Sequence, residues 1–433
     1  MMRKTGTMME VRSERQTEPT DRGMSDWQKT TVGEIASGFL SGGTPSTSRA
    51  DFWEGENPWI TSKWLGDKLE LTTGEKFVSE GAVKKTATKI VPKDSIIFAT
   101  RVGVGKVGIN RIDLAINQDL AGVLIDNERY DIKFLAYQLG IDSIQQYVAM
   151  NKRGATIKGI TRDCLEQIRL NLPPLPEQKK IAHILSTVQR AIEAQERIIQ
   201  TTTELKKALM HKLFTEGLRN EPQKQTEIGP IPESWEVVEI GDLGKCITGS
   251  TPKTKVDSFY DPPTEDFIAP ADLGARRYVY DSEKKISPEG MATIRPIPRN
   301  AVMCVCIGSS IGKVGMSYRE ESATNQQINS IICGEGRDPE FVYCLLSYRS
   351  DYWKSFATFG PVPILSKGRF STIGVPIPSS LDEQQAIAKP LVALETKVEV
   401  AEKKVTVLKD LFRTLLHELM TAKTRVNELE IST

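Results

Sequence analysis

The chain has 433 residues, more than one hydrophobic core usually organises, so at least two domains are expected. Hydrophobic residues at 39% and charged residues at 26% are typical of a soluble globular protein, and no stretch reaches the roughly eighteen apolar residues of a membrane span. The net charge of +1 neither suggests nor excludes a nucleic-acid partner, because binding depends on how Lys and Arg are distributed.

Residues 1–24 are polar and lack the apolar segment of a secretory signal, which predicts a disordered extension and leaves Met24 as an alternative start. The six cysteines form no C-x-x-C pair. They therefore indicate packing residues in a reducing cytosol and argue against a disulfide framework.

The second half of the sequence repeats the first at an offset of roughly two hundred residues, with the order of shared segments preserved. Each half runs from a globular module through a Pro-containing stop into a long helix. The shared segments are Trp27 and Trp235, residues 43–46 (GTPS) and 250–253 (STPK), 105–108 and 312–315 (both GKVG), 115–118 (AINQ) and 323–326 (ATNQ), and 172–178 (LPPLPEQ) and 377–384 (IPSSLDEQ).

The modules are predicted to be α+β. Residues 95–99 and 301–306 are short runs bounded by Pro and Gly that predict strands, whereas residues 134–150 and 341–356 have helical spacing. Trp59, Trp64 and Trp353 could contact bases or pack in the cores, and packing in the cores is favoured. The Gly- and Pro-containing linker at 225–233 is expected to be extended.

The segments after each Pro-containing stop show heptad spacing and predict helices of about 40 residues, on the order of 60 Å long. In the first helix Leu205, Leu209 and Leu213 continue the pattern after a small phase slip. The simplest partner for each helix is the other copy, in an intramolecular antiparallel coiled coil; the alternative is a homodimeric coiled coil. The predicted interface residues are Ile181, Leu185, Val188, Ile192, Ile199, Leu391, Leu394, Val398, Val405, Leu408, Phe412 and Leu415.

This order of segments resembles the specificity (S) subunits of type I restriction-modification systems. The residues that carry the resemblance are 172–178 at the start of the first long helix, the linker 226–235, and 377–385 at the start of the second. It covers nearly the whole chain from about Trp27, and a repeated Glu-Gln helix start at the repeat period makes it specific.

The resemblance implies two target recognition domains, each reading one half of a bipartite, asymmetric DNA site, with the helices as spacers that dock two modification (methyltransferase) subunits. Those partners would use S-adenosylmethionine, and a restriction subunit using ATP and magnesium can join them, so the complex would serve DNA methylation and phage defence in the cytoplasm. The expected boundaries are 1–24 for the extension, 25–175 for the first target recognition domain, 176–219 for the first helix, 220–234 for the linker, 235–379 for the second domain and 380–433 for the second helix.

Several motifs that suggest chemistry have simpler interpretations. Residues 103–106 and 308–313 resemble fragments of a phosphate-binding loop, but Val follows each Lys where Ser or Thr is needed, so a Gly-rich turn is favoured. Residues 261–264 (DPPT) lack the aromatic residue of the methyltransferase Asp-Pro-Pro-Tyr element. The histidines His183, His211 and His417 have no partners at ligand spacing, so no metal site and no catalytic residue are expected.

Candidates for DNA contact are polar and basic residues in the predicted loops, where Arg can bind guanine edges and Lys more often contacts phosphate. For Lys106 and Lys313, a turn alone and a turn with a phosphate contact remain open. The candidates are Thr44, Ser46, Lys63, Arg101, Lys106, Lys152, Arg153 and Lys158 in the first module, and Thr251, Lys253, Lys255, Arg276, Arg277, Lys313, Lys367 and Arg369 in the second.

Two other classes of function are compatible with parts of the sequence. A fused methyltransferase or nuclease would need cofactor or metal motifs that the sequence does not show. A coiled-coil scaffold without DNA binding would explain the helices and the near-zero charge, but not two modules in register with them. The sequence therefore predicts a non-catalytic DNA-specificity subunit that binds no cofactor itself.

Overall fold

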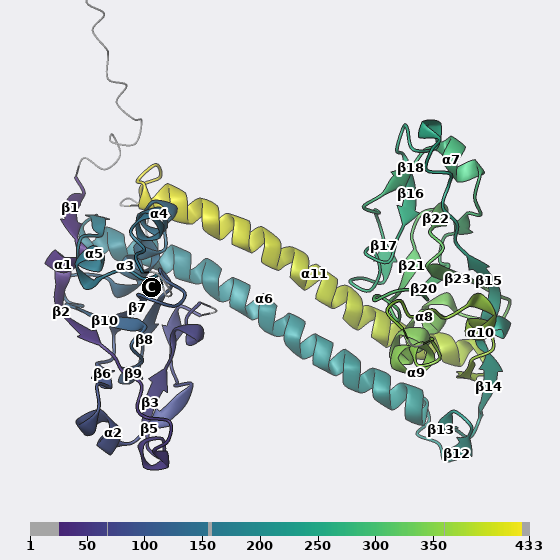
Figure 1. The fold of residues 1–433 in the computed structure, drawn as a ribbon, viewed down its shortest axis with the longest axis horizontal. Coiled ribbons are helices and arrows are strands. Elements are labelled where there is room, and N and C mark those ends of the chain that lie inside the picture. The colour runs from purple at the N-terminus through teal and green to yellow at the C-terminus, as the bar shows by residue number, and fades with distance from the viewer. Residues whose placement is uncertain (1–25, 67, 155–157, 359, 427–433) are drawn as a thin grey trace, which may run out of the picture. The chain divides into compact units, whose positions relative to one another are not determined.

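The computed structural model describes residues 26–426, apart from 67, 155–157 and 359. The chain divides into two compact units: residues up to Glu193 together with those from Thr406 onward, and residues Ala194–Val405. Each unit therefore contains one module and parts of both long helices (Figure 1). The predicted extension at 1–24 lies outside the described residues.

The module of the first unit is built on a five-stranded and a four-stranded sheet, and a separate two-stranded pair brings together its first and last strands. The five-stranded sheet has the order β2-β10-β7-β8-β4 and the four-stranded sheet the order β5-β3-β9-β6. The pair β1 (Gln28–Thr31) and β11 (Arg169–Leu172) is antiparallel. The other strands are β2 (Ala36–Ser41), β3 (Asn57–Ile60), β4 (Glu70–Leu71), β5 (Lys76–Val78), β6 (Lys89–Val91), β7 (Ser95–Ala99), β8 (Val107–Asn110), β9 (Leu114–Ile116) and β10 (Leu120–Ile125).

Five short α-helices complete the described part of this module, and four of them begin after a polar N-cap. Asp131, for example, accepts a hydrogen bond from the Phe134 amide, which satisfies one of the free N–H groups of the first turn. The helices are α1 (Val32–Ile35), α2 (Glu80–Lys85), α3 (Ile132–Leu139), α4 (Asp142–Met150) and α5 (Arg162–Glu166).

The second unit repeats this topology, with sheet orders β15-β23-β20-β21-β17 and β18-β16-β22-β19 and the closing pair β14-β24. Its strands are β14 (Trp235–Glu239), β15 (Gly244–Thr248), β16 (Glu265–Ile268), β17 (Tyr278–Val279), β18 (Lys285–Ile286), β19 (Ile297–Pro298), β20 (Val302–Val305), β21 (Val314–Ser317), β22 (Glu321–Thr324), β23 (Ile328–Cys333) and β24 (Gly374–Pro378). Its short helices are α7 (Pro288–Ala292), α8 (Pro339–Tyr348), α9 (Ser350–Lys354) and α10 (Lys367–Ser371).

The predicted α+β class and the strands at 95–99 and 301–306 are confirmed as β7 and β20. The two segments with helical spacing each form two helices, because Gly140 ends α3 and Arg349 ends α8. The linker departs from the prediction. It folds back as a hairpin of β12 (Gln223–Thr226) and β13 (Gly229–Pro232), since Gly229 adopts a φ of 98° at the turn.

The long helices are α6 (Leu175–Glu216) and α11 (Leu381–Met420), and they pack together antiparallel as predicted. In the first unit the start of α6 lies beside the end of α11, and in the second unit the end of α6 lies beside the start of α11. Ile181, Leu185, Ile192 and Leu391 are buried, and the other predicted interface residues are partly buried. Leu205 is exposed instead, so the phase slip removes it from the interface.

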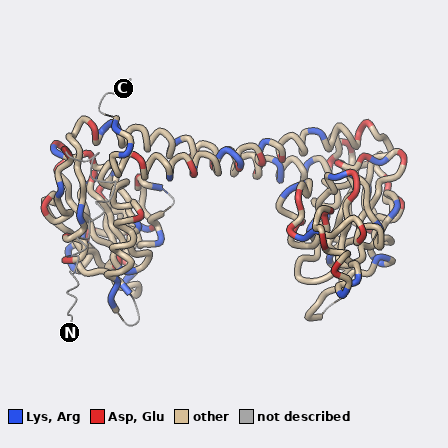
Figure 2. The backbone as a smooth tube through the Cα atoms, turned by 90° about the horizontal axis from the view of Figure 1, so that it is seen from above, with Lys and Arg blue, Asp and Glu red and all other residues tan. Residues whose placement is uncertain are grey.

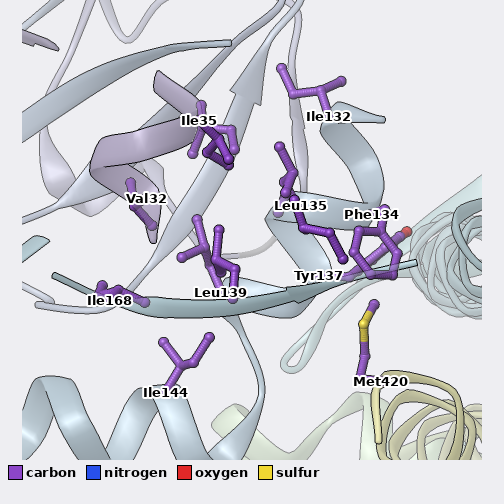
Figure 3. Close-up of a cluster of buried hydrophobic side chains, with 14 of the residues drawn as sticks. Val32, Ile35, Ile132, Phe134, Leu135, Tyr137, Leu139, Ile144, Ile168 and Met420 are labelled. Atoms are coloured by element: carbon purple, nitrogen blue, oxygen red, sulfur yellow. The ribbon is translucent and has the colours of Figure 1, made fainter. Parts of the chain in front are cut away.

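The main core of the first unit joins module and helices. Ile132, Phe134 and Leu135 of α3 and Met420 at the end of α11 belong to one buried cluster (Figure 3). A corresponding cluster in the second unit contains Phe341 of α8 and Phe214 near the end of α6. Trp59 and Trp353 are buried as expected, whereas Trp64 is 42% exposed on a short helical turn and is not a core residue.

Candidate nucleic-acid interface

The two Thr-Pro turns make the same side-chain contact in both modules. The hydroxyl of Thr44 donates to Gln118 Oε1 at 2.6 Å, and that of Thr251 donates to Gln326 Oε1 at 2.7 Å. The chain approaches closely here, because a Cβ added to Gly42 would lie 2.0 Å from the Ile116 carbonyl oxygen. Each turn is thereby fixed to the loop after β9 or β22. Gln118 and Gln326 appeared in the repeated segments but not among the predicted DNA contacts.

The segments 103–106 and 308–313 form turns between β7 and β8 and between β20 and β21. Gly103 and Gly105 have positive φ in the first turn. Lys106 Nζ donates to the Leu65 carbonyl at 2.7 Å, and Lys313 Nζ donates to the Pro270 carbonyl at 3.2 Å. Both ammonium groups therefore tie the turn to a neighbouring loop of their own module.

The first module has a groove of about 570 Å³ beside residues 100 and 101. Arg101 and Arg153 line it together with Gln118, and among the described residues neither arginine has an ion-pair partner. Arg162 also lines the groove, but it pairs with Glu166 at 2.6 Å and its guanidinium lies 4.9 Å from the centre of the Phe39 ring. Arg101 and Arg153 are thus the groove arginines available to an external partner.

The corresponding surface of the second module has basic side chains in a different place. Lys367 and Arg369 are exposed on α10, which follows Ser366, the N-cap that accepts a hydrogen bond from the Arg369 amide. The hairpin that precedes this helix carries Val362 and Ile364, and Ile364 pairs with Ile307 in an isolated bridge. At the positions of Arg101 and Arg153 the second module has Ile307 and Thr358, so it lacks the free arginines of the first.

The structure does not gather the remaining candidates into one site. Arg277 is held within its own unit, because it lies 3.3 Å from Glu340 and over the Tyr278 ring. Arg276 lines a separate cavity of about 470 Å³ beside α11, which Lys313 also reaches. Besides the arginines and lysines already described, the candidates that are exposed on the surface are Thr44, Ser46, Lys63, Lys152, Lys158, Thr251, Lys253 and Lys255.

The glutamines of the repeated Glu-Gln helix starts connect each module to its long helix. Gln178 Oε1 accepts from the Asp131 amide at 3.0 Å while its Nε2 donates to the Pro173 carbonyl at 2.8 Å. Gln384 makes the same pair of contacts with Asp338 and Pro378. Both glutamines are buried, so the motif fixes the N-terminus of α3 or α8 on the start of the helix.

The glutamates of these helix starts have different partners. Glu177 is buried and forms an ion pair with Arg425 at 2.8 Å, and Arg425 also pairs with Asp26 and lies over the Trp27 ring. In the second unit Glu383 instead accepts a hydrogen bond from Trp235 Nε1 at 3.1 Å. The equivalent glutamates of the repeat thus form an ion pair in one unit and accept a hydrogen bond from a tryptophan in the other.

Groups that could support chemistry are engaged in packing. Burial raises the pKa of the Cys306 thiol to about 12, which keeps it protonated. His211 Nδ1 lies 2.9 Å from the Tyr348 hydroxyl. In the described part of the chain no group of three or more His, Cys, Asp or Glu side chains could hold a metal ion, and no described helix is long and apolar enough to cross a bilayer.

Basic and acidic positions are interspersed along the backbone. Lys and Arg occur among Asp and Glu in both units and along the helices (Figure 2). The net charge of +1 therefore arises from nearly equal numbers of basic and acidic residues.

Comparison with known proteins gives consistent results. Residues 24–203 and 232–410 match the family described as type I restriction modification DNA specificity domain. The putative MjaX specificity subunit of Methanocaldococcus jannaschii is 30% identical over 69% of this chain and 69% of its own length. The MjaVIII specificity subunit of the same organism is 26% identical over 93% of this chain and 94% of its own length.

The crystal structure of the type I restriction-modification S subunit from M. genitalium has the same fold, with a TM-score of 0.64 and 18% identity over 91% of this chain and 96% of that chain. Specificity subunits are the non-catalytic components of type I restriction-modification complexes. From its two matched modules and its relatives, the chain belongs to the DNA-specificity subunits of type I restriction-modification systems.

Proposed function

We propose that each module reads one half of a bipartite, asymmetric DNA sequence and that α6 and α11 set the distance between the half-sites. The observation that supports this most directly is a repeated backbone with unlike exposed side chains: Arg101 and Arg153 in a groove of one module, Val362 and Ile364 on the surface of the other. A repeated frame favours two related docking geometries, and unlike side chains favour unlike half-sites.

The long helices are also the proposed docking surface for two methyltransferase subunits, and a restriction subunit can join that complex. S-adenosylmethionine would be bound by the methyltransferase subunits, and ATP and magnesium would be used by the restriction subunit. This division agrees with the near-zero net charge of the chain, because a partner can supply much of the phosphate contact that a weakly charged reader lacks.

Exchange of one module tests the proposal. Residues 27–171 would be replaced by the corresponding module of another specificity subunit, and the complex with its methyltransferase subunits would be expressed in cells whose DNA is then sequenced for methylated bases. We expect one half of the methylated motif to change while the other half and the spacer stay constant. A change in both halves, or in neither, would contradict the modular reading, and absence of any motif would favour a scaffold without DNA recognition.

A further inference from the structure

The free arginines of the first module and the exposed apolar residues of the second lie on or beside corresponding hairpins, at different positions within them. In the first module the Ile160 amide donates to the Thr100 carbonyl, and the Arg153 amide donates to the Gly159 carbonyl at 2.7 Å. In the second module the Leu365 amide donates to the Cys306 carbonyl, and the Thr358 amide donates to the Ile364 carbonyl at 2.9 Å. In both, a Thr or Ser N-cap and a short helix follow directly. The two hairpins are therefore the same structural element.

On this shared element the first module presents positive charge. Arg101 and Arg153 lie on its two facing segments, line one groove and have no ion-pair partner among the described residues. Gln118, fixed by Thr44, lines the same groove. Val102 on the adjacent turn is also exposed, so this module has an apolar contact beside its two guanidinium groups.

The second module presents hydrocarbon on the same element. Val362 is 57% exposed and Ile364 is 43% exposed, on a hairpin that is fixed to its module by backbone hydrogen bonds. Residues 358–364 contain no Lys or Arg, and the nearest exposed basic side chains, Lys367 and Arg369, belong to the next helix.

These two surfaces fit different base edges in the major groove of DNA. A guanidinium group can donate two hydrogen bonds to O6 and N7 of guanine, whereas an apolar side chain gains most from the 5-methyl group of thymine. Lys367 and Arg369 would then contact phosphates beside the apolar hairpin.

We infer that the first module recognises guanine through Arg101 and Arg153 and that the second recognises thymine methyl groups through Val362 and Ile364. This inference rests on the proposed function, because it assumes that each module reads a half-site. It adds the chemical class of base that each half-site contains.

Base analogues test the inference without changing the protein. With the motif known and its halves assigned by module exchange, the complex of the full chain with its methyltransferase subunits is titrated with DNA duplexes in a competition assay. Uracil in place of thymine removes only the 5-methyl group, and 7-deazaguanine removes only the N7 acceptor. We expect uracil to weaken binding by about 4-fold per contacted methyl group in the second half-site and to have little effect in the first. We expect 7-deazaguanine to weaken binding in the first half-site.

Substitutions in the protein provide a second test of the inference. R101A/R153A is expected to lose its preference for guanine by about 10- to 100-fold at one position of the first half-site and to keep the second half-site unchanged. V362S/I364T is expected to abolish the effect of uracil in the second half-site. The matched controls are R129A, an exposed arginine of the first unit, and L218S, an exposed leucine of the second, which should leave both preferences intact.

The inference is overturned if the second half-site contains no A·T pair, if uracil acts equally in both halves, or if R101A/R153A keeps its guanine preference. Failure of the proposed function looks different: module exchange would then fail to alter one half of the motif alone. The two failures are therefore distinguishable.

Discussion

At the edge of its five-stranded sheet, the first unit has an ionic cluster where the second has three tyrosines. Arg111, at the end of β8, pairs with Glu70 of β4 and with Asp94, and Lys133 also contacts Glu70. The homologous edge, β17 and β21, places Tyr278, Tyr280 and Tyr318 with ring centroids 4.7 to 6.1 Å apart. The backbone register is retained, since β4 pairs in parallel with β8 and β17 pairs in parallel with the equivalent strand β21.

At the junction between module and long helices, the aromatic contact is in the first unit and the ionic contact is in the second. In the first unit the Tyr137 ring meets Phe412 at 5.8 Å. In the second unit Tyr343 donates to Glu395 at 2.8 Å, and Lys206 pairs with Glu395 at 3.0 Å. Burial raises the pKa of the Tyr343 hydroxyl and the Glu395 carboxylate raises it further, so the hydroxyl stays protonated as the donor.

The two units therefore share backbone hydrogen bonds and helix caps, whereas the side chain at a given position can be charged in one unit and aromatic in the other. Gln178 and Gln384 keep identical contacts because those contacts are made to backbone groups, which every sequence provides. Side-chain clusters need only agree with their own neighbours, so each unit can satisfy them independently.

The largest effect is expected at the ion pair of Glu177. R425M would leave a carboxylate that is only 4% exposed without its partner, which should destabilise the first unit by about 3 kcal/mol. Hydrogen exchange of the amides of each unit would measure this separately. R219M is the matched control, because Arg219 occupies the homologous place after α6 and is exposed; it should change stability by less than about 0.5 kcal/mol. Equal loss in both units would contradict an effect confined to the first.

An intermediate effect is expected when the junction of the second unit is converted into that of the first. K206F alone leaves Glu395, which is 13% exposed, without its ammonium partner and should cost about 2 kcal/mol. K206F/E395Q introduces the Phe and Gln that the first unit has at Phe412 and Gln189, and should return stability to within about 1 kcal/mol of the parent protein. Denaturant unfolding of the three proteins measures the coupling. A double variant less stable than K206F would show that the two junctions are not interchangeable.

The smallest effect concerns the ionic sheet edge and depends on pH. Burial tends to raise the pKa of Glu70, but its hydrogen bonds and ion pairs with Arg111 and Lys133 outweigh burial and hold the pKa below its usual range. The stabilisation is therefore present above the unfolded-state pKa, about 4.3, and is lost as the pH falls through the lower folded value. R111Q should cost less than about 1 kcal/mol at pH 7, since Glu70 is partly exposed.

The difference in unfolding free energy between the parent protein and R111Q should shrink as the pH falls from about 5 to 3. Y318Q changes the homologous position of the second unit, where no carboxylate among the described residues is paired with the tyrosine, so its cost should be the same at both pH values. A cost of R111Q that stays constant with pH would rule out the Glu70 ion pair as its origin.

Sequence patterns predicted much of the architecture because they report local periodicity. The heptad spacing from Ile181 and from Leu391 gave the long helices, and the apolar runs at 95–99 and 301–306 gave central strands. The predictions failed where a tertiary contact or a turn decided the outcome. Gly229 turns the linker into a hairpin, and Trp64 is exposed on a turn, although its size favours burial.

The sequence alone determined the duplication, the two mixed modules, the paired helices and the family, since repeats and heptads are properties of residue order. Only the tertiary structure showed that Lys106 binds the Leu65 carbonyl, that Gln178 holds the N-terminus of α3, and that Arg101 and Arg153 share a groove. These contacts join residues distant in the chain, and their formation depends on the positions of backbone groups in space. For the same reason, unlike half-site chemistry could be inferred only after the hairpins at 153–159 and 358–364 were recognised as one structural element.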